Sequence, residues 1–242
     1  MKIIKVDAID STNTFLKDAL RNNSITLTTC VWAKTQRKGR GQRGAVWASK
    51  PGENLTFSAF YPIFKDIKKT PFVINLLTTI SIYKVLSKYK LVNLKIKWPN
   101  DILSANKKIG GVLIENIYKK NELSGTVIGI GLNVNQENFE NLPQASSIKN
   151  ILGYSLSLEV LLNDILTELT MRFNLYIESD FNSIKNEFES LLFRYKKPST
   201  FRVEGFDFPG IIQGITDEGK LCVLKEDRVL EEYDLKEIQL KY

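Results

Sequence analysis

Apolar residues recur along the chain at two spacings, and each spacing predicts a different element. Alternating apolar and polar positions, or short apolar runs rich in β-branched residues, predict strands. One such segment contains Pro99, and because proline cannot donate to a strand ladder we expect the strand to break there. The predicted strands of the first half are 2–9, 26–35, 53–61, 93–103, 109–118 and 122–135.

Apolar residues at helical spacing predict helices between and after these strands. The first helix is expected to run to about residue 20, with Asp10 or Ser11 as its cap. A second is expected from residue 70 to about 89, because Pro71 suits the first helical position and one apolar stripe follows. Two further helices are expected within 157–193.

From about residue 196 the pattern changes to short β segments separated by turns. We therefore predict an α+β protein. A mixed β-sheet body with flanking helices occupies 1–195, and a small β-barrel occupies 196–242. A tail of this size is small for an independent domain, so we expect it to pack against the body. No helix-turn-helix pattern precedes the first strand, and sequence-specific DNA binding is not expected.

Composition removes several classes of chemistry. Histidine is absent, which excludes Ser-His-Asp and Cys-His catalysis, histidine general bases and zinc sites that use histidine. Cys30 and Cys222 lack metal-type spacing, and reduced thiols are expected. The chain has neither an apolar run of the roughly 20 residues that span a bilayer nor the apolar core of a signal peptide. These features predict a cytoplasmic protein without a membrane segment.

The net charge of +7 is distributed unevenly. Residues 1–120 hold 22 lysines and arginines against 7 acids, whereas 121–242 hold 12 against 20. A basic half predicts a phosphate-bearing partner, either a nucleotide or a nucleic acid. Lysine used only for solubility is the alternative for the scattered positive charges.

The densest basic segment is RKGRGQRGAVW at 37–47, whose glycines fit G-x-G-x-x-G. A dinucleotide-binding loop would open a helix, but Pro51 and Gly52 follow instead. A protein-kinase lid would be followed by V-A-I-K, H-R-D and D-F-G, and none of these is present. A flexible basic hairpin loop remains the structural alternative.

Three further motifs accompany this loop: KWPND at 97–101, KKIGGVLIE at 107–115 and GIGLNVN at 129–135. Each alone fits an ordinary turn or hairpin. Together they predict a cavity rich in cations, amides and glycines and poor in nucleophiles, where a ligand can approach the backbone closely.

In this order, DSTN, the Arg/Gly loop, NLTFS, KWPND, KKIGGVLIE and GIGLNVN closely resemble the biotin–protein ligases, also called biotin–[acetyl-CoA-carboxylase] ligases. The resemblance covers nearly the whole chain and implies that the C-terminal barrel is SH3-like. It also implies the ligase-only type, without an N-terminal DNA-binding domain. The implied activity couples biotin to ATP with Mg²⁺, giving biotinyl-5′-AMP, and passes the biotinyl group to a lysine of a biotin carboxyl carrier protein. The protein itself is expected to be a monomer or a homodimer.

The resemblance also implies roles for individual residues. The catalytic group is expected to be Lys108, Arg40 and Arg43, and Asp101 is the expected metal ligand. The expected ATP contacts are Arg43, Trp47, Lys97, Asn100 and Asn133. The expected biotin contacts are Ser11, Thr12, Asn13, Gln36, Arg40, Gly41, Gln42, Lys108 and Gly111.

One departure from the family pattern lies in the loop. Many members read GRGRRGR, where this chain has Gln42 and Ala45 in place of two arginines. The loop therefore keeps fewer charges, and weaker retention of the adenylate is expected. Two alternatives stay open: a lipoate–protein ligase, whose signature loop contains histidine, and a basic RNA-binding protein with an SH3-like tail.

Overall fold

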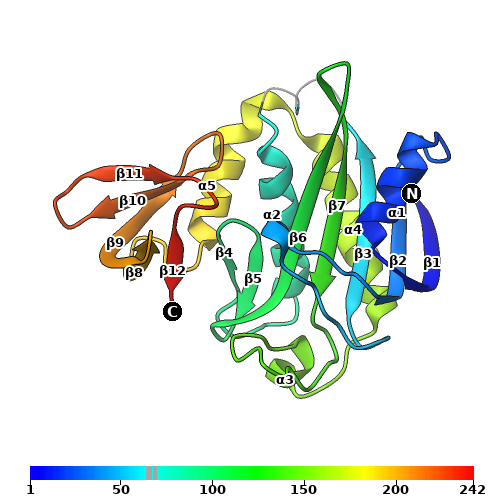
Figure 1. Cartoon of the computed structure of the whole chain (residues 1–242), viewed down its shortest axis with the longest axis horizontal. Coiled ribbons are helices and arrows are strands. Elements are labelled where there is room, and N and C mark those ends of the chain that lie inside the picture. Colours follow the sequence, from blue (N-terminus) through cyan, green and yellow to red (C-terminus); the bar gives the residue numbers. More distant parts are fainter. Residues whose placement is uncertain (64–66, 68–69) are drawn as a thin grey trace.

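The computed structural model describes residues 1–63, 67 and 70–242, apart from the side chain of Arg43. Its main element is a seven-stranded mixed sheet with the order β1-β2-β3-β7-β6-β5-β4 (Figure 1). The first two strands are parallel, and every other neighbouring pair is antiparallel. The strands are β1 (Lys2–Ile9), β2 (Thr29–Gln36), β3 (Leu55–Pro62), β4 (Lys95–Lys97), β5 (Asp101–Ser104), β6 (Lys107–Lys119) and β7 (Glu122–Leu132).

Alternation along the central strands divides the interior into two cores. Cys30 and Ala59 belong to the larger hydrophobic cluster, whereas their chain neighbours Val31 and Phe60 belong to a smaller one. Because successive side chains of a strand point to opposite faces, the two clusters lie on opposite faces of the sheet. Helix α1 (Thr12–Arg21) contributes Leu16 to the smaller cluster.

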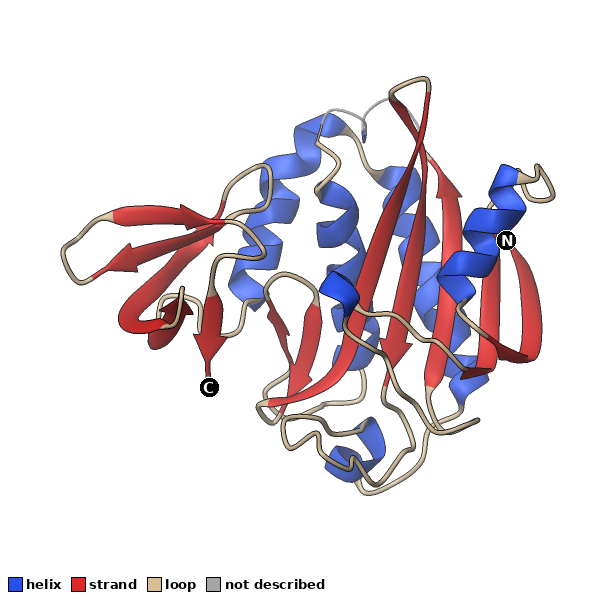
Figure 2. Ribbon diagram, in the orientation of Figure 1, coloured by secondary structure: helices blue, strands red, loops and turns tan. Residues whose placement is uncertain are grey.

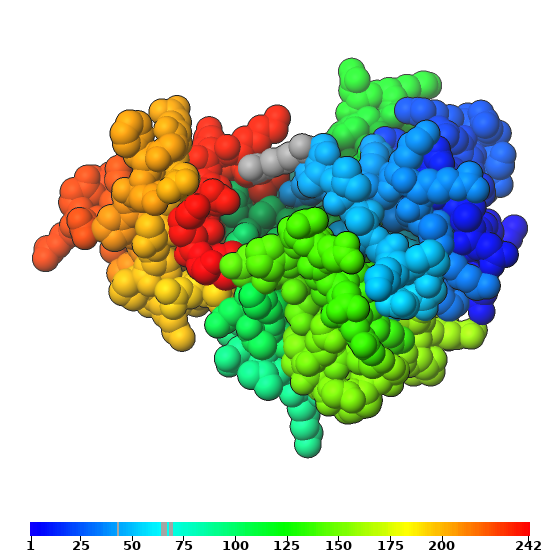
Figure 3. Space-filling view, turned by 60° about the horizontal axis from the view of Figure 1, so that its bottom comes forward, coloured from blue at the N-terminus to red at the C-terminus, as the bar shows by residue number. Residues whose placement is uncertain are grey.

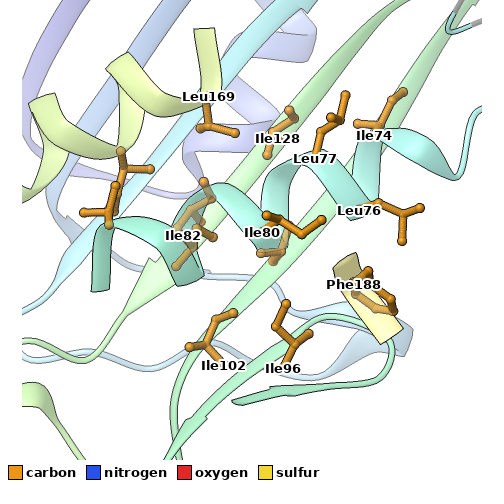
Figure 4. Packing of buried hydrophobic residues seen from close by; sticks show 14 of the residues in the cluster. Ile74, Leu76, Leu77, Ile80, Ile82, Ile96, Ile102, Ile128, Leu169 and Phe188 are labelled. Carbon is orange, nitrogen blue, oxygen red and sulfur yellow. The ribbon is translucent and has the colours of Figure 1, made fainter. Parts of the chain in front are cut away.

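Helix α2 (Val73–Ser87) lies at the centre of the larger core. The expected single apolar stripe is wrong for this helix, because residues on all of its faces are buried, including Thr78 and Ser81. The helix is enclosed by the sheet, by α4 (Leu158–Leu175) and by α5 (Phe181–Leu191) (Figure 4). The buried hydroxyl groups of Thr78, Thr79 and Ser81 donate to backbone carbonyls one turn back, as Thr78 does to Ile74 at 2.7 Å. The helix also begins three residues later than expected.

A second, five-stranded antiparallel sheet follows, in the order β11-β10-β9-β8-β12 (Figure 2). The predicted C-terminal β structure is confirmed. Strands β11 and β12 form the two edges of this sheet, so a closed barrel stays a prediction. The domain boundary at 195 also stays a prediction. The strands are β8 (Pro198–Val203), β9 (Phe206–Ile215), β10 (Leu221–Lys225), β11 (Leu230–Tyr233) and β12 (Gln239–Lys241).

The second sheet packs against the body, as the sequence predicts. Trp98 donates its indole N–H to the carbonyl of Gly219 at 2.9 Å, and the rings of Phe193 and Tyr242 meet edge to face at 5.1 Å. The space-filling view shows the C-terminal segment against the body (Figure 3).

A short helix that the sequence pattern did not indicate, α3 (Ile148–Leu152), is capped by Ser147. Over the described ranges, no helix has the length and apolar character needed to cross a bilayer.

Candidate functional site

A cavity of about 220 Å³ lies where the first turn of α1 and the Arg/Gly loop meet strands β5, β6 and β7. All of the residues predicted to contact biotin line it, together with Trp47, Asn100 and Asp101. The sequence motifs, which are spread over more than a hundred residues, therefore converge on one site. The remaining lining residues are Ala45, Val46, Phe57, Val112, Leu113, Gly129, Ile130 and Gly131.

The first turn of α1 supplies the buried polar wall. Ser11 caps the helix by accepting from the Thr14 N–H at 3.4 Å, so Ser11 rather than Asp10 is the cap. The next residue, Thr12, is buried, and its backbone N–H donates to Gln36 Oε1 at 2.8 Å. Thr12 Oγ1 also lies 2.6 Å from Ser58 Oγ. The helix start, β2 and β3 are therefore joined by side-chain hydrogen bonds at the cavity wall.

The Arg/Gly loop folds as a narrow hairpin over the cavity. The N–H of Trp47 donates to Gly39 at 2.9 Å, and Arg40 and Val46 form an isolated antiparallel bridge. A side chain at Gly39 would overlap the Trp47 carbonyl, so this neck requires glycine. Val46 is 80% exposed at the hairpin, consistent with a loop that covers the site without being part of the core.

Two glycines of β7 keep the sheet beneath the cavity free of side chains. A Cβ at Gly129 would overlap the amide oxygen of Asn13, and one at Gly131 would overlap the Trp47 indole. The two residues are separated by two positions, so they face the same side of the sheet. The indole Nε1 of Trp47 is buried and has no acceptor within the described part of the chain.

The cation at the centre of the site is Lys108 on β6. Its ammonium lies 2.6 Å from Asp101 Oδ1 and 6.0 Å from the centre of the Trp47 ring. The side chain of Lys108 is 35% exposed and that of Asp101 is 17% exposed, so a ligand can reach the pair. Gly111 lies beside them, and a Cβ there would make ordinary contacts of 3.4–3.5 Å with Lys108 and Asp101.

One acidic residue of the site had no role in the sequence prediction. Glu115 accepts from Asn13 Nδ2 at 2.9 Å, from Arg40 Nη2 at 2.9 Å and from Lys17 Nζ at 2.7 Å. Burial alone would raise the pKa of Glu115. The hydrogen bonds from Lys17 and Asn13 and the charge of Arg40 outweigh burial and hold the pKa below its ordinary value. The KKIGGVLIE motif contains this residue, but its partners could not be read from it.

Two predicted residues, Lys97 and Asn133, stand apart from the cavity lining, and the side chain of a third is not described. Lys97 lines a neighbouring cavity of about 430 Å³ beside the second sheet, with its ammonium 5.1 Å from the Tyr242 ring centre. Burial lowers the pKa of Lys97, Asp101 opposes this effect, and Lys108 adds to it. Asn133 is buried and donates to the Ser146 carbonyl at 3.0 Å. The side chain of Arg43 lies outside the described residues. The predicted ATP contacts of all three stay predictions.

The donor set fits a magnesium ion that arrives with a nucleotide. Among the residues that the structure describes, no three His, Cys, Asp or Glu side chains gather into a metal cage. Mg²⁺ does not need one, because it commonly binds one or two carboxylates together with substrate phosphates and water. Asp101 offers one carboxylate at the cavity, next to Lys108.

Known proteins are similar to this chain in sequence and in fold. Residues 6–133 match the Biotin/lipoate A/B protein ligase family. The chain is 30% identical over 226 residues to the bifunctional ligase/repressor BirA of Bacillus subtilis, covering 91% of this chain and 69% of that protein. It is 27% identical over 235 residues to BirA of Escherichia coli, covering 96% and 72%. A solved biotin protein ligase from Aquifex aeolicus, in complex with biotin and ATP, is similar at TM-score 0.78 and 26% identity, covering 99% of this chain and 98% of that one. The chain therefore belongs to the biotin/lipoate A/B protein ligase family.

Proposed function

We propose that this protein is an ATP-dependent biotin–protein ligase that forms biotinyl-5′-AMP and transfers the biotinyl group to a lysine of a biotin carboxyl carrier protein. The observation that carries the proposal is the cavity itself. It joins a polar wall, formed by buried Thr12 and Asn13 and half-buried Gln36, to a cation at Lys108. A ligand with a polar ring at one end and a carboxylate at the other matches this arrangement.

In the first step, a biotin carboxylate oxygen attacks the α-phosphorus of ATP and pyrophosphate leaves. Two anions must approach each other, and a fixed cation between them lowers the barrier. Lys108 can supply this charge by exchanging its contact with Asp101 for the carboxylate and an α-phosphate oxygen. Mg²⁺ held by Asp101 and the phosphates would neutralise further charge when bound. The reaction needs no enzyme nucleophile, which agrees with a chain that lacks histidine.

The second step is attack by the carrier lysine amine on the biotinyl carbonyl, which forms the amide and releases AMP. Access for that amine requires the loop to uncover the site. The cavity of about 220 Å³ is smaller than the roughly 300–1,000 Å³ usual for ligand pockets, so biotin and ATP together also require the loop to move. Arg40, Arg43 and Trp47 would then contact the bound nucleotide, with Trp47 Nε1 as an unused donor.

Biotin is favoured over lipoate because similar curated proteins include biotin–protein ligases, and the similar Aquifex structure contains biotin and ATP. Nothing in the site favours an RNA-binding role. A monomer or homodimer, a cytoplasmic location and the absence of sequence-specific DNA binding belong to the same proposal.

The decisive measurement is biotin-dependent exchange of pyrophosphate into ATP by the pure protein with Mg²⁺. We expect exchange that requires biotin and is not supported by lipoate. An absence of exchange would refute ligase activity, and exchange supported by lipoate but not by biotin would favour the alternative substrate. Transfer is tested next, with a biotin carboxyl carrier domain as the acceptor and a variant whose target lysine is replaced as the control.

A further inference from the structure

Glu115 lies behind the cavity wall and contacts the side chains that form it. It does not line the cavity, but two of its partners, Asn13 and Arg40, do. These partners belong to different elements, the first turn of α1 and the Arg/Gly loop. The third partner, Lys17, lies one turn further along α1 and is not part of the cavity lining.

The contacts of Glu115 fix the orientation of the Asn13 amide. Asn13 Nδ2 faces two acceptors, Glu115 Oε2 at 2.9 Å and the Leu113 carbonyl at 3.3 Å. Only the NH₂ end can donate to both, so Asn13 Oδ1 must point the other way, toward Ser58. Ser58 donates its hydroxyl proton to that oxygen.

The same direction continues through the next hydrogen bond. Ser58 has one proton, and because Asn13 accepts it, Ser58 Oγ is left to accept from the Thr12 hydroxyl at 2.6 Å. Thr12 Oγ1 also lies 3.0 Å from Gln36 Oε1, but its single proton must bridge the shorter contact to Ser58, whose own proton is on Asn13. Gln36 Oε1 accepts the Thr12 backbone N–H at 2.8 Å, which leaves Gln36 Nε2 as a donor. Thr12, Asn13 and Gln36 all line the cavity, so the direction of this chain sets which polar atoms can donate to a ligand.

Building on the proposed function, we propose that Glu115 is a positioning residue for biotin. It orients the Asn13–Ser58–Thr12 hydrogen bonds so that donors and acceptors match the ureido ring, and it holds Arg40 of the loop against β6. A carboxylate suits both tasks, since it only accepts hydrogen bonds and can pair with two cations at once. Its side chain is 20% exposed, so water competes weakly for these contacts.

The test is Glu115→Gln, which keeps the size of the side chain but replaces one acceptor with a donor. The new NH₂ group must face either Lys17 or the Asn13–Arg40 pair, and either choice disturbs the network. We expect the KM for biotin in the exchange assay to rise at least ~10-fold, the equivalent of ~1.4 kcal/mol, with the KM for ATP changed less than about twofold. The matched control is Glu137→Gln, whose exposed carboxylate pairs with Lys149 away from the cavity.

A second measurement reports how tightly the Arg/Gly loop is held in the free protein. The Arg40 side chain is held by Glu115, whereas Lys38, which is 78% exposed, pairs with Asp10 and does not contact Glu115. Limited trypsin digestion of the free protein, mapped by mass spectrometry, should give more cleavage after Arg40 relative to Lys38 in Glu115→Gln than in the unmodified protein. A purely structural loss would accelerate both cleavages together.

The Lys17→Met variant tests whether Glu115 acts by orienting Asn13 and Arg40 or only by attaching α1 to β6 through its ion pair with Lys17. It removes one ion pair of Glu115 but leaves the Asn13 and Arg40 contacts, and the biotin KM should stay within about twofold. An equal rise in both variants, or an unchanged biotin KM in Glu115→Gln, would overturn the proposal. Should Glu115→Gln not fold, Ser58→Ala removes the next bond of the same chain, and an unchanged biotin KM there would also overturn it. Absence of exchange in the unmodified protein would instead refute the proposed function.

Discussion

Replacement of Lys108 by methionine tests the proposed first step most directly. Methionine keeps the apolar stem but removes the ammonium that lies 2.6 Å from Asp101. A hydrogen bond to a charged group contributes about 1.5–3 kcal/mol. If Lys108 makes such a bond mainly in the transition state, its loss should lower adenylate formation by ~10–150-fold at about 1.4 kcal/mol per factor of ten.

The fold should tolerate this change. The Lys108 side chain is partly exposed, and an exposed ion pair contributes at most about 1 kcal/mol to stability. The assay is single-turnover formation of biotinyl-AMP, with thermal unfolding measured in parallel. Lys107→Met is the matched control, because its ammonium donates to the Pro143 carbonyl outside the cavity. Adenylate formation within threefold of the unmodified rate in a folded Lys108→Met protein would refute the assigned role.

Four further outcomes are expected. Trypsin should cleave within 37–46 in the free protein and much more slowly with biotin and ATP; equal rates would contradict a closing loop. Gln42→Arg should release preformed adenylate several-fold more slowly in stopped-flow experiments, because a charged contact adds ~1 kcal/mol; equal release rates would show that other loop cations already compensate. Gly129→Ala should raise the biotin KM because its Cβ would overlap Asn13, and an unchanged value would show that the helix start can shift. DNA binding should be weak, nonspecific and strongly salt-dependent, so salt-resistant retention of one promoter fragment would contradict it.

The sequence located most of the cavity lining because its motifs coincide with the start of α1, the loop after β2 and neighbouring parts of β5, β6 and β7. Alternation alone would put Asn133 on the cavity face, but Asn133 does not line the cavity, and its predicted contact with ATP stays a prediction. Gly129 and Gly131 face the cavity, and the same spacing points to Asn133, but β7 ends at Leu132. Beyond that point the backbone turns, and the Asn133 amide bonds to Ser146 instead.

Glu115 shows a different limit. Its partners Asn13 and Arg40 lie 102 and 75 positions away in the sequence, and no local spacing links them. Likewise, the pattern of α2 predicted one buried stripe, because periodicity reports only the residues of the helix itself. That α4 and α5 cover its other faces depends on how distant segments pack.

The bare strand surface under the cavity restricts how the range of accepted ligands could be altered. At Gly129 and Gly131 the floor already consists of backbone alone, so every replacement there adds atoms. Substitution of the floor can therefore exclude ligands but can never admit bulkier ones. Room for a larger biotin analogue would have to come from trimming wall side chains such as Phe57 or Trp47.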